Sequence, residues 1–153
     1  MTQIDYRDTT TTEELYAIAK AAYKGSPWTK QLFENDLKNK NAHYLIVLVD
    51  NQPAGFVGGT LIIDELSISN VAIVPTQQGV HLAERMLVAY FANFAPKTRV
   101  LLEVREQNKR AIRLYERMGF EVYNVREEYY RDPVEDAYLM DVYLPLQKGE
   151  TNG

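Results

Sequence analysis

Residues 100–120 constrain the fold more than any other part of this 153-residue chain. Residues 100–104 form an apolar run that contains one carboxylate, Glu103, and the run predicts a buried strand. Gln107 and Asn108 then begin a helix, and Gly119 is placed to end it in the left-handed conformation. The apolar residues of this helix recur at helical spacing, at Ala111, Leu114, Tyr115 and Met118. A strand followed by a tight loop and a helix predicts a crossover between parallel strands.

Glu103 and Tyr115 are the candidate chemical groups of this segment. Residues 108–115 span about two helical turns, so the carboxylate of Glu103 and the phenol of Tyr115 could border one cleft as a base and an acid. Alternatively, backbone donors satisfy Glu103, and Tyr115 is a core aromatic residue with its hydroxyl at the rim. Composition and spacing leave both interpretations open.

The rest of the chain alternates between strand and helix patterns. A short strand at residues 4–6 precedes a helix that opens with a Thr11–Glu14 capping box and stops near Gly25. Thr29 is the expected N-cap of a second helix. Three strands at residues 43–49, 54–63 and 66–74 predict an antiparallel meander. Trp28 lies at the joint between the first two helices, either as a packing residue or as the wall of a pocket.

The second half of the chain contributes a loop, a helix and two closing strands besides the 100–120 segment. Residues 75–81 form a glycine-bearing loop before a helix that starts at Leu82, which is either an anion site or an ordinary turn. Closing strands are expected at residues 120–123 and 137–144. The aromatic and charged residues 126–136 between them predict a long loop, which is either a binding loop or only surface.

Composition excludes several classes of function. The net charge of −4 and the absence of a Lys/Arg cluster argue against nucleic-acid binding. There is no cysteine, and the two histidines are far apart, so neither a disulfide nor a metal site is expected. No leader or membrane-spanning run is evident, which favours the cytosol. We expect one domain at residues 1–146 and a polar tail at residues 147–153.

The order of these elements resembles the GNAT acetyltransferase superfamily. The similarity covers nearly the whole chain, and its most specific part, residues 102–120, is similar to the bacterial ribosomal-protein-alanine N-acetyltransferases. Residues 27–29, 70–73, 129–130 and 135–137 also resemble that subgroup. The resemblance implies an α+β fold with a central mixed, mostly antiparallel sheet of about seven strands and about four helices.

The resemblance also implies a reaction and a set of site residues. Acetyl-CoA would be attacked directly by the N-terminal α-amine of a protein, with no metal, in a monomer or weak dimer. Glu103 would be the base, and Tyr115 the acid that protonates the departing thiolate. Cofactor contacts are implied for Val71, Ile73, Gln78, Gly79, Val80, His81, Leu82, Ala83 and Asn108. Substrate contacts are implied for Trp28, Tyr129, Tyr130 and Asp136.

His81 departs from the family pattern, which has an inner glycine at this position of the phosphate loop. A side chain there either crowds the diphosphate or requires a strained backbone. Alternatively, the backbone stays helical, and the imidazole points outward and assists phosphate binding. Three functions therefore remain open. The acceptor is a protein N-terminus, the acceptor is a small amine such as a polyamine, or the chain is a catalytically weak CoA-binding module.

Overall fold

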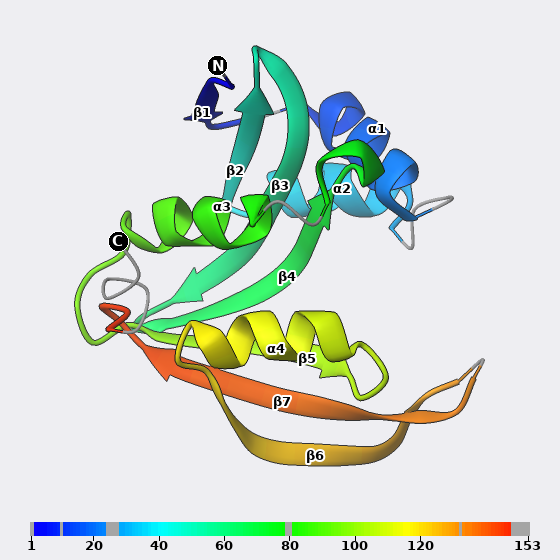
Figure 1. Ribbon diagram of the computed structural model, residues 1–153, viewed down its shortest axis with the longest axis vertical. Coiled ribbons are helices and arrows are strands. Elements are labelled where there is room, and N and C mark those ends of the chain that lie inside the picture. The colour runs from blue at the N-terminus through cyan, green and yellow to red at the C-terminus, as the bar shows by residue number, and fades with distance from the viewer. Residues whose placement is uncertain (1, 10, 24–27, 79–80, 132, 148–153) are drawn as a thin grey trace. The chain divides into compact units, whose positions relative to one another are not determined.

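The computed structural model describes residues 2–9, 11–23, 28–78, 81–131 and 133–147. The strands join in the order β1-β2-β3-β4-β5-β7-β6. The β4–β5 pair is parallel, as predicted, whereas β1–β2, β2–β3, β5–β7 and β6–β7 are antiparallel. Together with the four α-helices found in these ranges, this mixed, mostly antiparallel sheet confirms the predicted fold class (Figure 1).

The chain divides into two compact units, residues 1–61 with 69–90 and residues 62–68 with 91–153. The helices are α1 (Thr12–Tyr23), α2 (Lys30–Leu37), α3 (Leu82–Phe91) and α4 (Lys109–Arg117). The strands are β1 (Ile4–Arg7), β2 (Ala42–Val49), β3 (Gln52–Ile62), β4 (Glu65–Ile73), β5 (Arg99–Arg105), β6 (Glu121–Tyr130) and β7 (Glu135–Tyr143). A 3-10 turn at Pro75–Gln77 follows β4. Residues 148–153 of the expected tail and the helix stop at Gly25 lie outside the described residues.

The core of the first unit forms where α1 and α2 cover the sheet. Its buried residues are Leu15, Ile18, Ala19, Phe33, Tyr44, Ile46, Phe56 and Ala72. Thr29 caps α2 as predicted, because its hydroxyl accepts the N–H of Leu32 at 3.2 Å. A Cβ on Gly58 would lie 2.3 Å from the ring of Tyr44, so this glycine makes room for that ring in the core.

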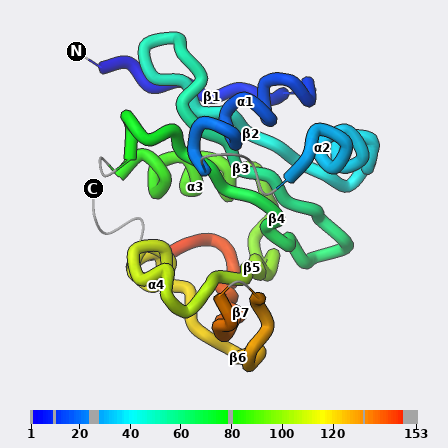
Figure 2. Tube along the Cα trace, turned by 90° about the vertical axis from the view of Figure 1, so that its right-hand side faces the viewer, coloured from blue at the N-terminus to red at the C-terminus, as the bar shows by residue number. Residues whose placement is uncertain are grey.

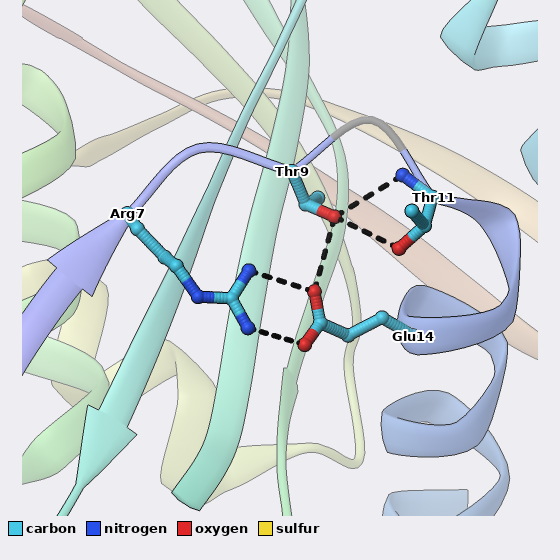
Figure 3. A network of polar contacts seen from close by, with 4 residues as sticks. All are labelled: Arg7, Thr9, Thr11 and Glu14. Carbon is cyan, nitrogen blue, oxygen red and sulfur yellow. Dashed lines mark hydrogen bonds and ion pairs between the residues drawn. The ribbon is translucent and has the colours of Figure 1, made fainter. Parts of the chain in front are cut away.

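The start of α1 is stabilised differently from the predicted capping box. The carboxylate of Glu14 accepts both guanidinium N–H groups of Arg7, at 2.9 and 2.5 Å, and the hydroxyl of Thr9 at 3.1 Å (Figure 3). The backbone N–H of Thr11 donates to the Thr9 hydroxyl instead of to Glu14. The arginine therefore ties β1 to the first turn of α1, where the helix dipole favours a negative charge.

The second unit is built around β5, β7 and α4. Asn108 is the N-cap of α4, since its side-chain oxygen accepts the N–H of Ala111 at 3.3 Å. Gly119 follows the helix with φ +104°, the left-handed stop that the sequence predicts. The buried stripe of the helix runs through Ile112, Tyr115 and Met118. Figures 1 and 2 both show α4 alongside β5 and β7.

The prediction of a long loop at residues 126–136 is wrong, because most of these residues belong to strands. β6 extends to Tyr130 and β7 begins at Glu135. β6 ends the strand order and is exposed along nearly its whole length, so its sequence carries no buried alternation that would mark a strand. Charged side chains on such an edge strand produce the composition of a loop.

Candidate functional site

Glu103 is exposed, not buried as the sequence predicts. Side chains alternate along β5, and its buried face carries Val100, Leu102 and Val104. Glu103 lies on the opposite face with Arg105. The apolar run therefore identified the strand correctly, but it concealed which of its two faces carries the carboxylate.

Glu103 belongs to a polar network at the end of β5. Its Oε2 accepts the hydroxyl of Tyr130 at 3.3 Å. The guanidinium of Arg105 stacks on the ring of Tyr130, 3.9 Å from the ring centre, and donates to Glu135 at 2.6 Å. Burial, followed by the charge of Glu103 and the hydrogen bond to it, raises the pKa of Tyr130 to about 12, so the phenol remains a donor.

The β6–β7 hairpin has an irregular register next to Tyr129 and Tyr130. Glu128 has φ +50°, and the pairing of β6 with β7 shifts between Arg126 and Tyr130. The carboxylate of Asp136 accepts the N–H of Glu128 at 2.9 Å and stabilises this distortion. The rings of Tyr129 and Tyr130 meet edge to face, 5.2 Å apart.

Tyr115 lies in α4, and Asn108 is the N-cap of this helix. Tyr115 is buried, and its ring packs 5.6 Å from that of Phe120. The hydroxyl that hydrogen-bonds Glu103 belongs to Tyr130 and not to Tyr115. The joint action of Glu103 and Tyr115 on one substrate therefore stays a prediction. Asn108 is exposed, and its side-chain oxygen is occupied by the helix cap. Its amide NH2 is the group with which it would contact a cofactor.

In the first unit, side chains already hydrogen-bond the two backbone carbonyls of β4 that the sequence assigns to the cofactor. The hydroxyl of Tyr23 donates to the carbonyl of Val71, and burial raises the pKa of Tyr23. The side-chain amide of Gln78 donates to the carbonyl of Ile73 at 2.8 Å. Each carbonyl has a second lone pair for a ligand. Gln78 thus anchors the loop to β4, a role that the sequence did not reveal.

His81 has φ +61°, so it holds the left-handed conformation that a glycine would adopt there. This finding favours the strained-backbone alternative over the helical one. The carbonyl of His81 accepts the N–H of Arg85 at 3.2 Å, and α3 begins at Leu82. The N–H groups of Leu82 and Ala83 belong to the first turn, whose donors have no partner within a helix. Gly79 and Val80 lie outside the described residues.

Trp28 packs in the first unit, with its ring 5.1 Å from that of Phe33 against the core cluster. This contact favours the packing interpretation, and its role in substrate binding stays a prediction. Asn70 precedes Val71 on β4 and is buried, and among the described residues its side-chain Nδ2 has no hydrogen-bond partner. Arg105 and Glu135 belong to the network at Glu103, but their sequence positions predicted no role for them. The spacing of Arg105 two residues after Glu103 could have indicated a shared face.

Among the described residues, His, Asp and Glu side chains form no group of three or more that could hold a metal ion. No helix within the described ranges combines the length and the apolar character needed to cross a membrane.

Comparisons with known proteins identify the family. The model of the acetyltransferase (GNAT) family matches residues 11–120. A Bacillus subtilis relative is 35% identical over 86% of this chain and 89% of its own. The Escherichia coli [ribosomal protein bS18]-alanine N-acetyltransferase is 33% identical over 95% of this chain and 100% of its own.

A solved structure agrees with these matches. The crystal structure of the ribosomal-protein-S18-alanine N-acetyltransferase from Escherichia coli superposes with a TM-score of 0.81, at 26% identity over 96% of each chain. The family model covers well over half of this chain, and the relatives match it almost end to end. The chain therefore belongs to the GNAT acetyltransferase family.

Proposed function

We propose that the protein transfers the acetyl group of acetyl-CoA to the N-terminal α-amine of a protein, with an N-terminal alanine of a ribosomal protein as the acceptor. The names of its relatives, including an enzyme of Haemophilus influenzae that is 33% identical over 86% of this chain, support this acceptor. The observation that carries the chemistry is the exposed Glu103 carboxylate held by the hydroxyl of Tyr130. The proposed compartment is the cytosol, and the proposed state is a monomer or weak dimer.

Glu103 is the proposed base that removes a proton from the α-amine. An α-amine has a pKa near 8, so much of it is protonated at neutral pH and must lose a proton before it attacks. An exposed carboxylate can accept that proton directly or through a water molecule. Acetyl-CoA supplies an activated thioester, and the amine attacks it without a covalent enzyme intermediate. Tyr115 is the proposed donor of the proton that the departing sulfur takes up.

Binding of the nucleotide and of the peptide is assigned to separate groups. The first-turn amides of Leu82 and Ala83 suit the diphosphate, because backbone N–H groups and the helix dipole favour an anion there. The backbone of Val71 and Ile73 would hold the pantetheine arm, and Asn108 would contact the cofactor.

The acceptor is assigned to the hairpin. Tyr129 and Tyr130 offer aromatic faces, and the hydroxyl of Tyr130 binds Glu103. Asp136 supports them indirectly, because its carboxylate holds the backbone of Glu128. Trp28 is retained as a peptide contact to be tested, because its packing against Phe33 leaves it only partly buried.

The test is release of free CoA with a panel of acceptors. The panel contains a peptide that begins with alanine, the same peptide with a blocked N-terminus, and a free polyamine. We expect turnover with the first peptide alone. Turnover with the polyamine and not with the peptide would replace the proposed acceptor by a small amine. Binding of acetyl-CoA without turnover on any acceptor would reduce the protein to a CoA-binding module.

The catalytic assignments have their own variants. Glu103→Gln and Tyr115→Phe should each lower kcat by about 10²-fold or more, since each removes an acid–base group and keeps the shape of the side chain. Glu121→Gln on β6 and Tyr143→Phe on β7 are matched controls at exposed positions of the same unit and should leave kcat unchanged. Wild-type rates in both test variants would show that the roles are misassigned.

A further inference from the structure

Arg105 and Glu135 form an ion pair that the proposed chemistry does not use. Nη1 of Arg105 lies 2.6 Å from Oε1 of Glu135, whose side chain is only 6% exposed. The second oxygen, Oε2, accepts the backbone N–H of Gln107 at 3.2 Å. A buried carboxylate with both oxygens hydrogen-bonded is fixed in position, and a charge-assisted bond to it fixes the guanidinium. Glu135 therefore acts as an anchor for Arg105.

A face of the guanidinium contacts the ring of Tyr130, while its edge donates to Glu135. The central carbon of the Arg105 guanidinium is 3.9 Å from the centre of the Tyr130 ring, which is a close cation–π contact. Tyr130 lies opposite Glu135 in the β6–β7 register, so the anchor and the stacked ring come from paired positions of one hairpin. The hydroxyl of this ring donates to Glu103 at 3.3 Å. The contacts thus form one series that runs from Glu135 through Arg105 and Tyr130 to Glu103.

We infer that Arg105 is a positioning residue, which is clamped by Glu135 and fixes the ring of Tyr130 so that its hydroxyl holds the Glu103 carboxylate in one orientation. The inference rests on the proposed role of Glu103 as the base. An exposed glutamate has several rotamers of similar energy, and a base that samples them all is seldom aligned with the amine. The stacked tyrosine removes that freedom. Arg105 does not touch the reacting atoms.

A double-mutant cycle separates positioning from general support of the hairpin. Arg105→Lys keeps a positive charge beside Glu135 but loses the planar guanidinium that covers the ring. We expect kcat to fall about tenfold while KM for acetyl-CoA stays within about twofold. In a Tyr130→Phe background the same change should alter kcat by less than about twofold, because the link to Glu103 is already broken. An equal loss in both backgrounds would overturn the inference.

Two further variants exclude unfolding of the hairpin and a general effect of losing an arginine. Arg105→Gln combined with Glu135→Gln removes both charges, so no unpaired buried charge is left to unfold the hairpin, and it should reproduce the loss of kcat. Arg99→Lys is the matched control. Arg99 also binds a carboxylate, that of Asp141 at 2.8 Å, and lies over a tyrosine ring, that of Tyr123 at 4.8 Å, but at the other end of β5. Arg99→Lys should leave kcat unchanged, and a loss equal to that of Arg105→Lys would contradict the inference.

A measurement that needs no turnover keeps the inference distinct from the proposed function. The side-chain carboxyl 13C resonance of Glu103, identified by its loss in Glu103→Gln, should shift in Tyr130→Phe and in Arg105→Lys and should not shift in Arg99→Lys. An unchanged resonance in Arg105→Lys would refute the link between Arg105 and Glu103. If the wild-type protein acetylates no amine, the proposed function fails, and the resonance still decides whether the link exists.

Discussion

The left-handed backbone at His81 yields a prediction about stability that the sequence alone does not. At φ +61°, an L-residue with a Cβ is held in a conformation that costs about 1–2 kcal/mol, and somewhat less for histidine, which occurs there more often than most residues. Glycine adopts this conformation freely. It also gives the unfolded chain more freedom, which offsets about 0.4–1 kcal/mol of the gain.

The informative comparison is between His81→Gly and His81→Ala, because both remove the imidazole and differ only in the Cβ. We expect the glycine variant to be more stable than the alanine variant by about 0.5–1 kcal/mol. For a chain of this size that difference is a Tm higher by about 1–4 °C. Urea unfolding, with the free energy of unfolding extrapolated to water, measures the same quantity independently of temperature.

Glycine and alanine variants at two other positions, Lys97 and Ala89, serve as controls. At Lys97, which has φ +74°, the glycine variant should again be more stable than the alanine variant. At Ala89, inside α3, the sign should reverse, and glycine should be less stable by about 1 kcal/mol. If glycine at position 81 proved less stable than alanine, as in the helix, the backbone at this position would be helical and the strained loop would be refuted.

Three other predictions concern stability. Ile63→Asn should raise the free energy of unfolding by about 1 kcal/mol in a urea titration. The side chain of Ile63 is 93% exposed, and its φ of +59° is a value that β-branched residues rarely adopt and that asparagine tolerates. Thr29→Ala should lower the free energy of unfolding by about 1 kcal/mol, since the cap on Leu32 is lost; an unchanged Tm would exclude this cap. The hydrogen bond with Arg7 holds the pKa of Glu14 below its ordinary value of 4.5, so its stabilisation is present above pH 4.5 and lost as pH falls through the lowered pKa. Wild type and Glu14→Gln should therefore converge in stability on acidification, and a constant difference would contradict this.

Much of the fold was predictable because the signals that fix it are local. The cap residues Thr29 and Asn108 begin their helices, and Gly119 ends α4 with the predicted positive φ. The parallel β4–β5 pair followed from the crossover. The two closing strands were predicted, but the extension of β6 to Tyr130 and the start of β7 at Glu135 were missed. β6 is an exposed edge strand, so its charged and aromatic residues carry no burial pattern.

The candidate site was predicted only in part, because its contacts join residues that are far apart in the sequence. The motif in residues 102–120 contains Glu103, but the strand pattern could not show that this carboxylate is exposed. The hydrogen bond from Tyr130 spans 27 residues, and the ion pair between Arg105 and Glu135 spans 30. Neither separation leaves a periodic signal. His81 was singled out correctly as unusual, and only the backbone dihedral distinguished strain from a helical start.

The central claim, that this chain acetylates an α-amine, can be tested on a single peptide that begins with alanine and also contains one internal lysine. After incubation with acetyl-CoA, tandem mass spectrometry locates the added acetyl group. We expect the acetyl group on the α-nitrogen of the alanine, whose pKa near 8 leaves far more free amine at neutral pH than the lysine with its pKa near 10.4. Acetylation of the lysine instead, or of neither nitrogen, would contradict the claim.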